Sequence, residues 1–296
     1  MKNQMVKRIA SVLLAGVMVV SLAACGGDKQ TEKKDKDDSK KSSKKETEIQ
    51  VFIAASLNTV MTELAKEYNE DHPEVKITFN ADSSGTLLTQ IEEGYECDLF
   101  FSAAQKQMDQ LESDGLVVDG TRADVLNNQV VVISLKDSGT KVKGLENLQD
   151  AKSIALAGGS VPVGKYTRQA LVNLGILKTD GEIDAITTQQ VSEALGGVEI
   201  SEEDNVSKVL TAVAEGSCEV GTTYYSDTYG YEDKLDILQV VSYDLTGDVI
   251  YPICQVKNEE ADKTQTAAAK DFYKFVLSDK AKKVFDAYYF DTDVER

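Results

Sequence analysis

The chain has 296 residues, of which 42% are hydrophobic and 28% are charged, and it contains only 3 Pro and 4 Cys. This composition excludes a disordered, a collagen-like and a disulfide-stapled protein, and the length allows one large or two ordinary domains. The net charge of −18 is unevenly distributed: the first 47 residues hold 11 Lys or Arg against 6 Asp or Glu, and the remainder holds 21 against 44. Because an acidic body repels phosphate backbones, we expect no nucleic-acid partner.

The N-terminus has the features of an export signal. Three basic residues within the first eight precede an apolar stretch, Ile9–Leu22, that is too short to cross a membrane comfortably. The sequence Leu22-Ala23-Ala24-Cys25 follows and resembles the lipobox of bacterial lipoproteins, whose cysteine carries a diacylglycerol. We therefore expect a signal peptide at residues 1–24, lipidation of Cys25, and anchoring to the outer face of the cell membrane.

Residues 25–47 are predicted to form a disordered tether. Asp28–Glu46 consists almost wholly of Lys, Asp, Glu and Ser, and it lacks the apolar surface that a fold needs. Beyond the tether remain Cys97, Cys218 and Cys254, an odd number, so at least one thiol is free. No CxxC spacing indicates a metal or redox pair, and we expect these residues to serve as small hydrophobic side chains.

From residue 48 onward, short β-branched segments alternate with amphipathic ones. This alternation is typical of α/β proteins with mostly parallel sheets, and its length favours two lobes. The stretch Thr179–Glu203 is rich in Gly and acidic residues, has weak periodicity, and is predicted to be a surface insertion. The predicted strands are Glu48–Ile53, Val75–Phe79, Asp98–Phe101, Gln129–Leu135, Ser153–Leu156, Val220–Thr223, Ile237–Val241 and Ile250–Val256. The predicted helices are Leu57–Asn69, Thr86–Glu93, Gln105–Asp114, Lys165–Leu174, Val206–Glu215, Lys263–Leu277 and Asp279–Tyr288.

The sequence argues against an enzyme. Its only histidine, His72, lies in a predicted solvated loop, which leaves a serine or cysteine nucleophile without a histidine base. Glycine-rich phosphate-binding motifs with the established spacings are absent. A lipid-anchored hydrolase that uses Ser56 or Ser84 as nucleophile is an alternative, but it would need Lys165 as its base.

Small, hydroxyl-rich turns that open helices recur four times along the chain. Each turn directs free backbone N–H groups and the positive end of a helix toward the carboxyl edge of a sheet, where α/β proteins bind ligands. One such turn alone would indicate ordinary N-capping. Several in one exported chain indicate an anion held between two lobes. The turns are Ala54–Leu57, Asn80–Thr86, Gly158–Gly164 and Glu203–Ser207.

These segments resemble the molybdate-binding proteins (ModA type), the substrate-binding proteins of molybdate ABC transporters. The resemblance implies a two-lobed periplasmic-binding-protein fold of type II. It places lobe 1 at 48–130 and 252–296 and lobe 2 at 131–251, with crossings near Val130–Ser134 and Val249–Pro252. The segments that carry it are Ala54–Leu57, Ser83–Leu87, Gln90–Gly94, Asp98–Ala103, Val161–Tyr166, Gln169–Leu171 and Gly221–Asp227.

The resemblance also implies a site for a tetrahedral oxyanion, molybdate or tungstate. Ser56 and Ser84 would supply hydroxyl and backbone N–H donors from one lobe. The other lobe would supply the backbone N–H groups of Val163 and Val206 and the phenol of Tyr224. The anion would be bound whole, without direct ligands to the metal and without a cofactor. A monomer would deliver it to the membrane permease of an ABC transporter.

A site made only of donors favours molybdate, tungstate and sulfate, which carry no proton near neutral pH, over phosphate, whose proton needs an acceptor. Asp82 stands next to the predicted serine donors, and we expect its carboxylate to cap its own turn. A receptor for sulfate or phosphate remains an alternative, because the sequence does not fix the radius of the cavity.

Overall fold

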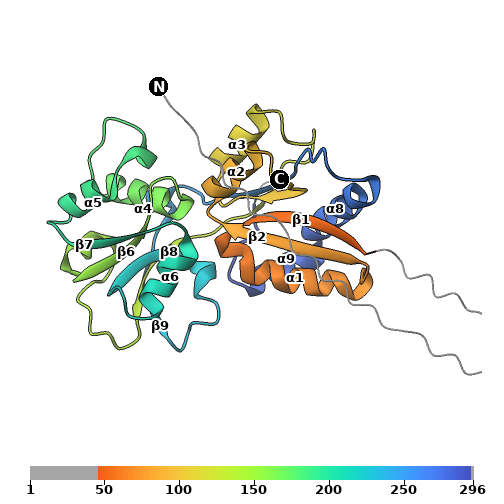
Figure 1. The fold of residues 1–296 in the computed structure, drawn as a ribbon. Coiled ribbons are helices and arrows are strands. Elements are labelled where there is room, and N and C mark those ends of the chain that lie inside the picture. The colour runs from red at the N-terminus through yellow and green to blue at the C-terminus, as the bar shows by residue number, and fades with distance from the viewer. Residues whose placement is uncertain (1–45, 295–296) are drawn as a thin grey trace, which may run out of the picture. The chain divides into compact units, whose positions relative to one another are not determined.

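The computed structural model describes residues 46–294, so the predicted signal peptide, Cys25 and almost all of the predicted tether lie outside the described residues. Within the described part, two five-stranded sheets have the orders β2-β1-β3-β10-β4 and β7-β6-β8-β5-β9. Figure 1 shows both sheets flanked by helices. The first sheet holds β1 (Thr47–Ala54), β2 (Val75–Asp82), β3 (Leu99–Phe101), β4 (Ala123–Leu126) and β10 (Tyr251–Gln255). The second holds β5 (Val130–Leu135), β6 (Ser153–Ala157), β7 (Glu199–Glu203), β8 (Val220–Tyr224) and β9 (Leu235–Val240).

The two sheets share one topology. In the first, β1 pairs in parallel with β2 and β3, while β10 runs antiparallel to β3 and β4. In the second, β6 pairs in parallel with β7 and β8, while β5 runs antiparallel to β8 and β9. In each sheet the antiparallel strand, β10 in the first and β5 in the second, is the first strand after the chain crosses from the other sheet. The prediction of two mostly parallel lobes with the type II arrangement is therefore confirmed; we refer to each sheet with its packed helices as lobe 1 and lobe 2.

The chain passes from lobe 1 to lobe 2 at residues 127–129, between β4 and β5, and returns at residues 241–250, between β9 and β10. The sequence placed the first crossing at Val130–Ser134, but that segment is part of strand β5. Its β-branched residues are fully buried because β8 and β9 flank the strand and helices pack on it. The segment Val249–Pro252 spans the end of the return and the start of β10.

The helices cover both faces of the first sheet (Figure 1). Along β1 the side chains alternate: Ile49, Val51 and Ile53 join one core with α1, α8 and α9, whereas Phe52 joins a smaller cluster with α2 and α3. In lobe 2, α4 and α6 pack against the sheet. The helices are α1 (Asn58–Asp71), α2 (Ser84–Glu92), α3 (Gln105–Ser113), α4 (Pro162–Asn173), α5 (Thr188–Ala194), α6 (Val206–Ala214), α7 (Tyr243–Thr246), α8 (Lys263–Val276) and α9 (Asp279–Ala287), with 3-10 turns η1 (Ala55–Leu57), η2 (Leu145–Asp150), η3 (Ile183–Ala185) and η4 (Tyr225–Thr228).

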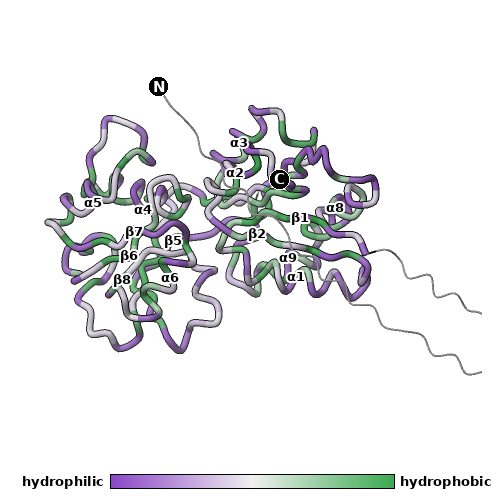
Figure 2. Tube along the Cα trace, in the orientation of Figure 1, coloured by the Kyte–Doolittle hydropathy of each residue, from purple (hydrophilic) through white to green (hydrophobic). Residues whose placement is uncertain are grey.

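Hydropathy follows this layering. Figure 2 shows hydrophobic residues concentrated along the strands of both sheets and hydrophilic residues in the outer loops. Among residues 46–294, no helix has the length and apolar character that a membrane span requires.

The stretch Thr179–Glu203 is not a surface insertion, so this prediction was wrong. It contains α5 and ends in β7, which pairs in parallel with β6 from Ser153↔Glu199 to Ala157↔Glu203 and forms an edge of the second sheet. The hydrophobic periodicity of the stretch is weak because β7 is polar and largely solvent-facing. In α5 the buried residue is Val191.

Candidate functional site

All five residues predicted to hold an anion line a single cavity. It lies at the carboxyl ends of the parallel strands, with walls from both lobes. Its volume of about 10 Å³ is on the scale of one water-sized sphere, so only a compact solute fits it. The lining residues are Ala54, Ala55, Ser56, Asp82, Ser83, Ser84, Ala103, Val161, Pro162, Val163, Val206 and Tyr224.

Three helices begin at this cavity. The N–H groups of Ser84 in α2, Val163 in α4 and Val206 in α6 belong to first turns and make no hydrogen bond within residues 46–294. Pro162 is the first residue of α4 and costs the helix no hydrogen bond, because an N–H at this position would have no partner within the helix. The free N–H groups and the positive helix ends together make the cavity attractive to an anion.

The Ser84 side chain is prepared as a donor. Its oxygen accepts a hydrogen bond from the Ala103 N–H at 2.9 Å, and the residue is almost fully buried. No bond within the described residues uses its hydroxyl proton, which is therefore available to a solute in the cavity. The Ser56 hydroxyl lies 2.9 Å from the hydroxyl of Tyr251, a residue that the sequence analysis did not single out.

Tyr224 carries the clearest unmet hydrogen bond. Its side chain is buried, its ring contacts that of Tyr251, and its hydroxyl has no partner in the part of the chain that the structure describes. Burial, followed by the nearby Tyr251, raises the pKa of Tyr224 well above its usual value, so the phenol keeps its proton. A buried polar group without a partner costs free energy, and a ligand that accepts from it removes the cost.

Asp82 is the one charged residue among those that line the cavity. Its Oδ1 accepts from the N–H of Ser83 at 2.7 Å and from Nδ2 of Asn205 at 3.1 Å. The predicted cap was wrong, because the N-cap of α2 is Ser83, whose side chain accepts from the Thr86 N–H.

Arg168 holds the turn between β6 and α4 and was missed by sequence reasoning, since an arginine in a predicted helix is ordinarily solvated. It is fully buried and donates to the carbonyls of Ala157, Gly164 and Ile186 at 2.8 to 2.9 Å. Burial lowers the pKa of Arg168 to about 10, so the guanidinium stays charged at neutral pH.

A Cβ on Gly164 would lie 2.2 Å from the carbonyl oxygen of Gly158, so only glycine fits this turn.

Asp227, a second missed residue, fixes the backbone at Tyr224. Its Oδ2 accepts from the Thr223 hydroxyl at 2.7 Å and from the Tyr224 N–H at 3.0 Å. Part of the residue reaches solvent, but its carboxylate is enclosed, and this loss of solvation raises the pKa of Asp227 to about 6.

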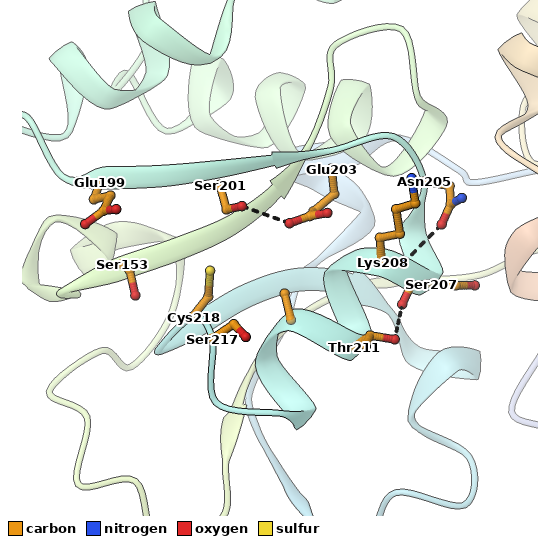
Figure 3. Close-up of a pocket in the computed structure, with 11 residues that line it drawn as sticks. Ser153, Glu199, Ser201, Glu203, Asn205, Ser207, Lys208, Thr211, Ser217 and Cys218 are labelled. Carbon is orange, nitrogen blue, oxygen red and sulfur yellow. Dashed lines mark hydrogen bonds between the residues drawn. The ribbon is translucent and has the colours of Figure 1, made fainter.

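A larger depression in lobe 2, between β7 and α6, has a volume of about 570 Å³ (Figure 3). Its polar groups largely satisfy one another: Ser201 donates to Glu203 at 2.9 Å, and the Thr211 hydroxyl donates to the Ser207 carbonyl at 2.9 Å. Neither of the unpartnered buried side-chain atoms of the described residues lies there. We therefore assign the site to the small cavity between the lobes.

Metal-ligating groups do not gather in the described residues. They contain no cluster of His, Cys, Asp and Glu that could hold a metal ion. Cys97, Cys218 and Cys254 are free and buried, as expected for small hydrophobic side chains.

The family model for bacterial extracellular solute-binding proteins matches residues 49–291. The chain belongs to this family. The putative ABC transporter substrate-binding lipoprotein YvgL of Bacillus subtilis is 30% identical over 84% of this chain and 88% of its own. The molybdate-binding protein ModA of Haemophilus influenzae is 28% identical over 82% of this chain and 89% of its own.

A solved solute-binding domain gives the same result. The substrate-binding domain of a putative molybdenum ABC transporter from Clostridium difficile is 32% identical, has a TM-score of 0.59, and matches over 84% of this chain and 99% of that one. The predicted resemblance to the ModA type is confirmed by these similarities. The relatives are solute-binding transport proteins rather than enzymes, which agrees with the prediction of a binding module.

Proposed function

We propose that this solute-binding protein captures molybdate or tungstate outside the cytoplasm and delivers it to the permease of an ABC transporter. The buried Tyr224 hydroxyl carries the proposal: it has no partner within residues 46–294, and Tyr224 lines the same cavity as Ser84, Val163 and Val206, whose N–H groups are also free within those residues. Ser56, Ser84, Val163, Val206 and Tyr224 are the proposed oxyanion-binding residues, and they bind through the oxygens without touching the metal.

The acidic body does not oppose this function. Charges on the surface are screened within about 8 to 10 Å at physiological salt, so local dipoles dominate in the cavity. Each charge-assisted hydrogen bond contributes about 1.5 to 3 kcal/mol. A handful of them supports micromolar to nanomolar affinity after the cost of association.

The donors favour an anion without a proton. Among the lining side chains, Asp82 is the one carboxylate that could accept the proton of phosphate, and its Oδ1 already accepts from Ser83 and Asn205. Sulfate has the same charge as molybdate and is the nearest competitor. Two relatives named for molybdate or molybdenum support molybdate over sulfate.

Two further parts of the proposal concern location. Cys25 is outside the described residues, and its lipidation is supported by the lipobox-like sequence and by a relative named as a lipoprotein. A lipid anchor would hold the protein at the outer face of the membrane, next to the permease to which it delivers. We expect it to act there as a monomer and without a cofactor.

Calorimetric titration of a chain lacking residues 1–25 tests the ligand. Molybdate and tungstate should bind at least about a hundredfold more tightly than sulfate, and phosphate should not bind detectably. Phosphate binding equal to or tighter than molybdate binding would reject a site made of donors and would identify Asp82 as an acceptor. Turnover of an ester substrate would instead favour the hydrolase, which already lacks support because Lys165 is not among the residues that line the cavity.

A further inference from the structure

Behind Ser56 lies a chain of hydrogen bonds that reaches both segments linking the lobes. The Ser56 hydroxyl is 2.9 Å from the hydroxyl of Tyr251, which opens β10 just after the return segment. The same Tyr251 oxygen accepts from Nδ2 of Asn128 at 3.2 Å, and Asn128 belongs to the first crossing at residues 127–129. All three residues are buried, so solvent does not compete for these bonds.

The direction of the chain follows from the surroundings of Asn128. Its Oδ1 accepts from the N–H groups of Gln129 at 2.9 Å and Ser226 at 3.4 Å, so this atom must be the oxygen. The Nδ2 group then donates one hydrogen to the Ser226 hydroxyl at 2.8 Å and the other to Tyr251. The amide thereby uses its full capacity and fixes the Tyr251 oxygen as an acceptor on that side.

The Tyr251 proton has a single destination. Among the described residues, the only acceptor within hydrogen-bond distance of this hydroxyl is Oγ of Ser56. If Ser56 donated instead, the Tyr251 proton would be buried without a partner, which costs free energy. Burial and the charge of Asp227 also raise the pKa of Tyr251 well above its usual value, so the phenol has a proton to give.

We propose that Tyr251, oriented by Asn128, is a positioning residue that donates to the Ser56 oxygen and so commits the Ser56 proton to the bound anion. Ser56 lines the cavity, and its oxygen is occupied from behind, so its own hydrogen points toward the solute. Ser84 is arranged in the same way by the Ala103 N–H. This inference rests on the proposed function only in that the solute is an oxyanion, whichever member of that class binds.

A double-mutant cycle tests the proposal with molybdate, tungstate, sulfate and phosphate as probes on the chain lacking residues 1–25. Tyr251→Phe should lower the affinity for the most tightly bound of these anions about three- to thirtyfold in the wild-type background. In a Ser56→Ala background the same change should alter affinity less than about twofold, because the serine through which Tyr251 acts is gone. Equal losses in both backgrounds would overturn the positioning role and leave the proposed function intact.

Asn128→Asp provides a second variant with reversed polarity. Its carboxylate only accepts, so the Tyr251 proton turns toward it, the Ser56 oxygen loses its donor, and the Ser56 hydroxyl becomes free to donate backward to Tyr251 instead of to the anion. The added negative charge weakens binding in any background, whereas the reversal requires Ser56. The loss should therefore be at least about threefold larger with Ser56 present than with Ser56→Ala, and equal losses would contradict the proposal.

Tyr273→Phe is the matched control. It removes a hydroxyl that donates to the Thr121 carbonyl at 2.7 Å in lobe 1, away from the cavity, and it should leave affinity unchanged. Thermal melting identifies any variant that fails to fold. If either Tyr251→Phe or Asn128→Asp fails to fold, the remaining one tests the proposal. A folded wild-type protein that binds none of the four anions would overturn both this inference and the proposed function.

Discussion

Oδ1 of Asp82, at the end of β2, accepts a hydrogen bond from Nδ2 of Asn205, the N-cap of α6, at 3.1 Å. This bond joins the two lobes beside the cavity. Lys106 of α3 and Asp184 of η3 form a second link between the lobes, and Lys106 lowers the pKa of Asp184 chiefly through their hydrogen bond. The donors of the two lobes therefore meet around one cavity in a closed arrangement, and we expect the return to an open form to break both links.

Asp82→Asn should tighten binding of a dianion. The amide oxygen can still accept from Ser83 and Asn205, while the negative charge next to the anion disappears. We expect affinity for molybdate to rise about three- to tenfold by calorimetry. Asp204→Asn is the control, because Asp204 is highly exposed and pairs with Lys208, and it should change affinity less than about twofold. Weaker binding by Asp82→Asn would show that the carboxylate itself holds the solute.

Tyr224→Phe should lower the affinity for the anion without destabilising the protein. The change keeps the ring and deletes one charge-assisted bond, so affinity should fall by about 1.5 to 3 kcal/mol, or roughly ten- to 150-fold. Stability without ligand should not fall, since the hydroxyl has no partner within residues 46–294. Tyr225→Phe changes a neighbour that does not line the cavity and whose ring contacts that of Tyr289, and it should change affinity by no more than about threefold. Loss at Tyr225 instead would mean that the family resemblance places the site tyrosine one residue too early.

Much of this arrangement could be predicted from local sequence. The strand–turn–helix signals at Ser56, Ser84, Val163 and Val206 are short-range, because an N-terminal helix turn leaves the same N–H groups free wherever it occurs. The parallel strands then bring these turns to one edge of each sheet. Tyr224 was found only through the family resemblance, since a tyrosine at the end of a strand has no distinctive local pattern.

The residues behind the site could not be predicted in this way. Asn128 and Tyr251 meet across 123 positions of sequence, and Arg168 uses its guanidinium on the carbonyls of three separate segments. Such contacts exist only once the sheets are assembled. Strand β7 was missed for a different reason: an edge strand in an acidic, solvent-facing stretch lacks the hydrophobic alternation that predicts a strand.

Arg168→Met should destabilise the protein by at least about 3 kcal/mol, because it leaves the carbonyls of Ala157, Gly164 and Ile186 buried without their donor. Urea denaturation measures this change. Arg122→Met is the control: Arg122 is partly exposed and pairs with the exposed Asp109 and Glu112, and its loss should cost about 1 kcal/mol. Equal losses for the two variants would contradict the structural role of Arg168.

Cys25→Ala should release the full-length protein from membranes. The acyl chains attached to Cys25 would supply the anchoring, and without the thiol no diacylglycerol can be added. In Triton X-114 partitioning of whole cells, the unaltered protein should enter the detergent phase and the variant should not. Cys97→Ala, which changes a buried thiol of the folded body, should partition like the unaltered protein. A Cys25→Ala protein that stayed in the detergent phase would rule out this anchor.

Asp227 should make stability depend on pH between about 4 and 6. Its pKa is raised from an ordinary 3.8 to about 6 in the folded state, mainly by burial, so the folded protein binds a proton more tightly than the unfolded chain does. The stabilisation is fully present below pH 3.8 and is lost as pH rises through 6. The stability of the wild type relative to Asp227→Asn should therefore fall by about 2 to 3 kcal/mol from pH 4 to pH 7.

Urea denaturation across that pH range measures the free energy of unfolding of both proteins. Taking the difference between them removes the contribution of the many other carboxylates. Thr223→Val provides an independent check, because the Thr223 hydroxyl donates to Asp227 and lowers its pKa. Without this donor, the pKa of Asp227 should rise further, and the loss of stability should move to higher pH. A constant difference between wild type and Asp227→Asn from pH 4 to pH 7 would show that the carboxylate titrates alike in the folded and unfolded chains.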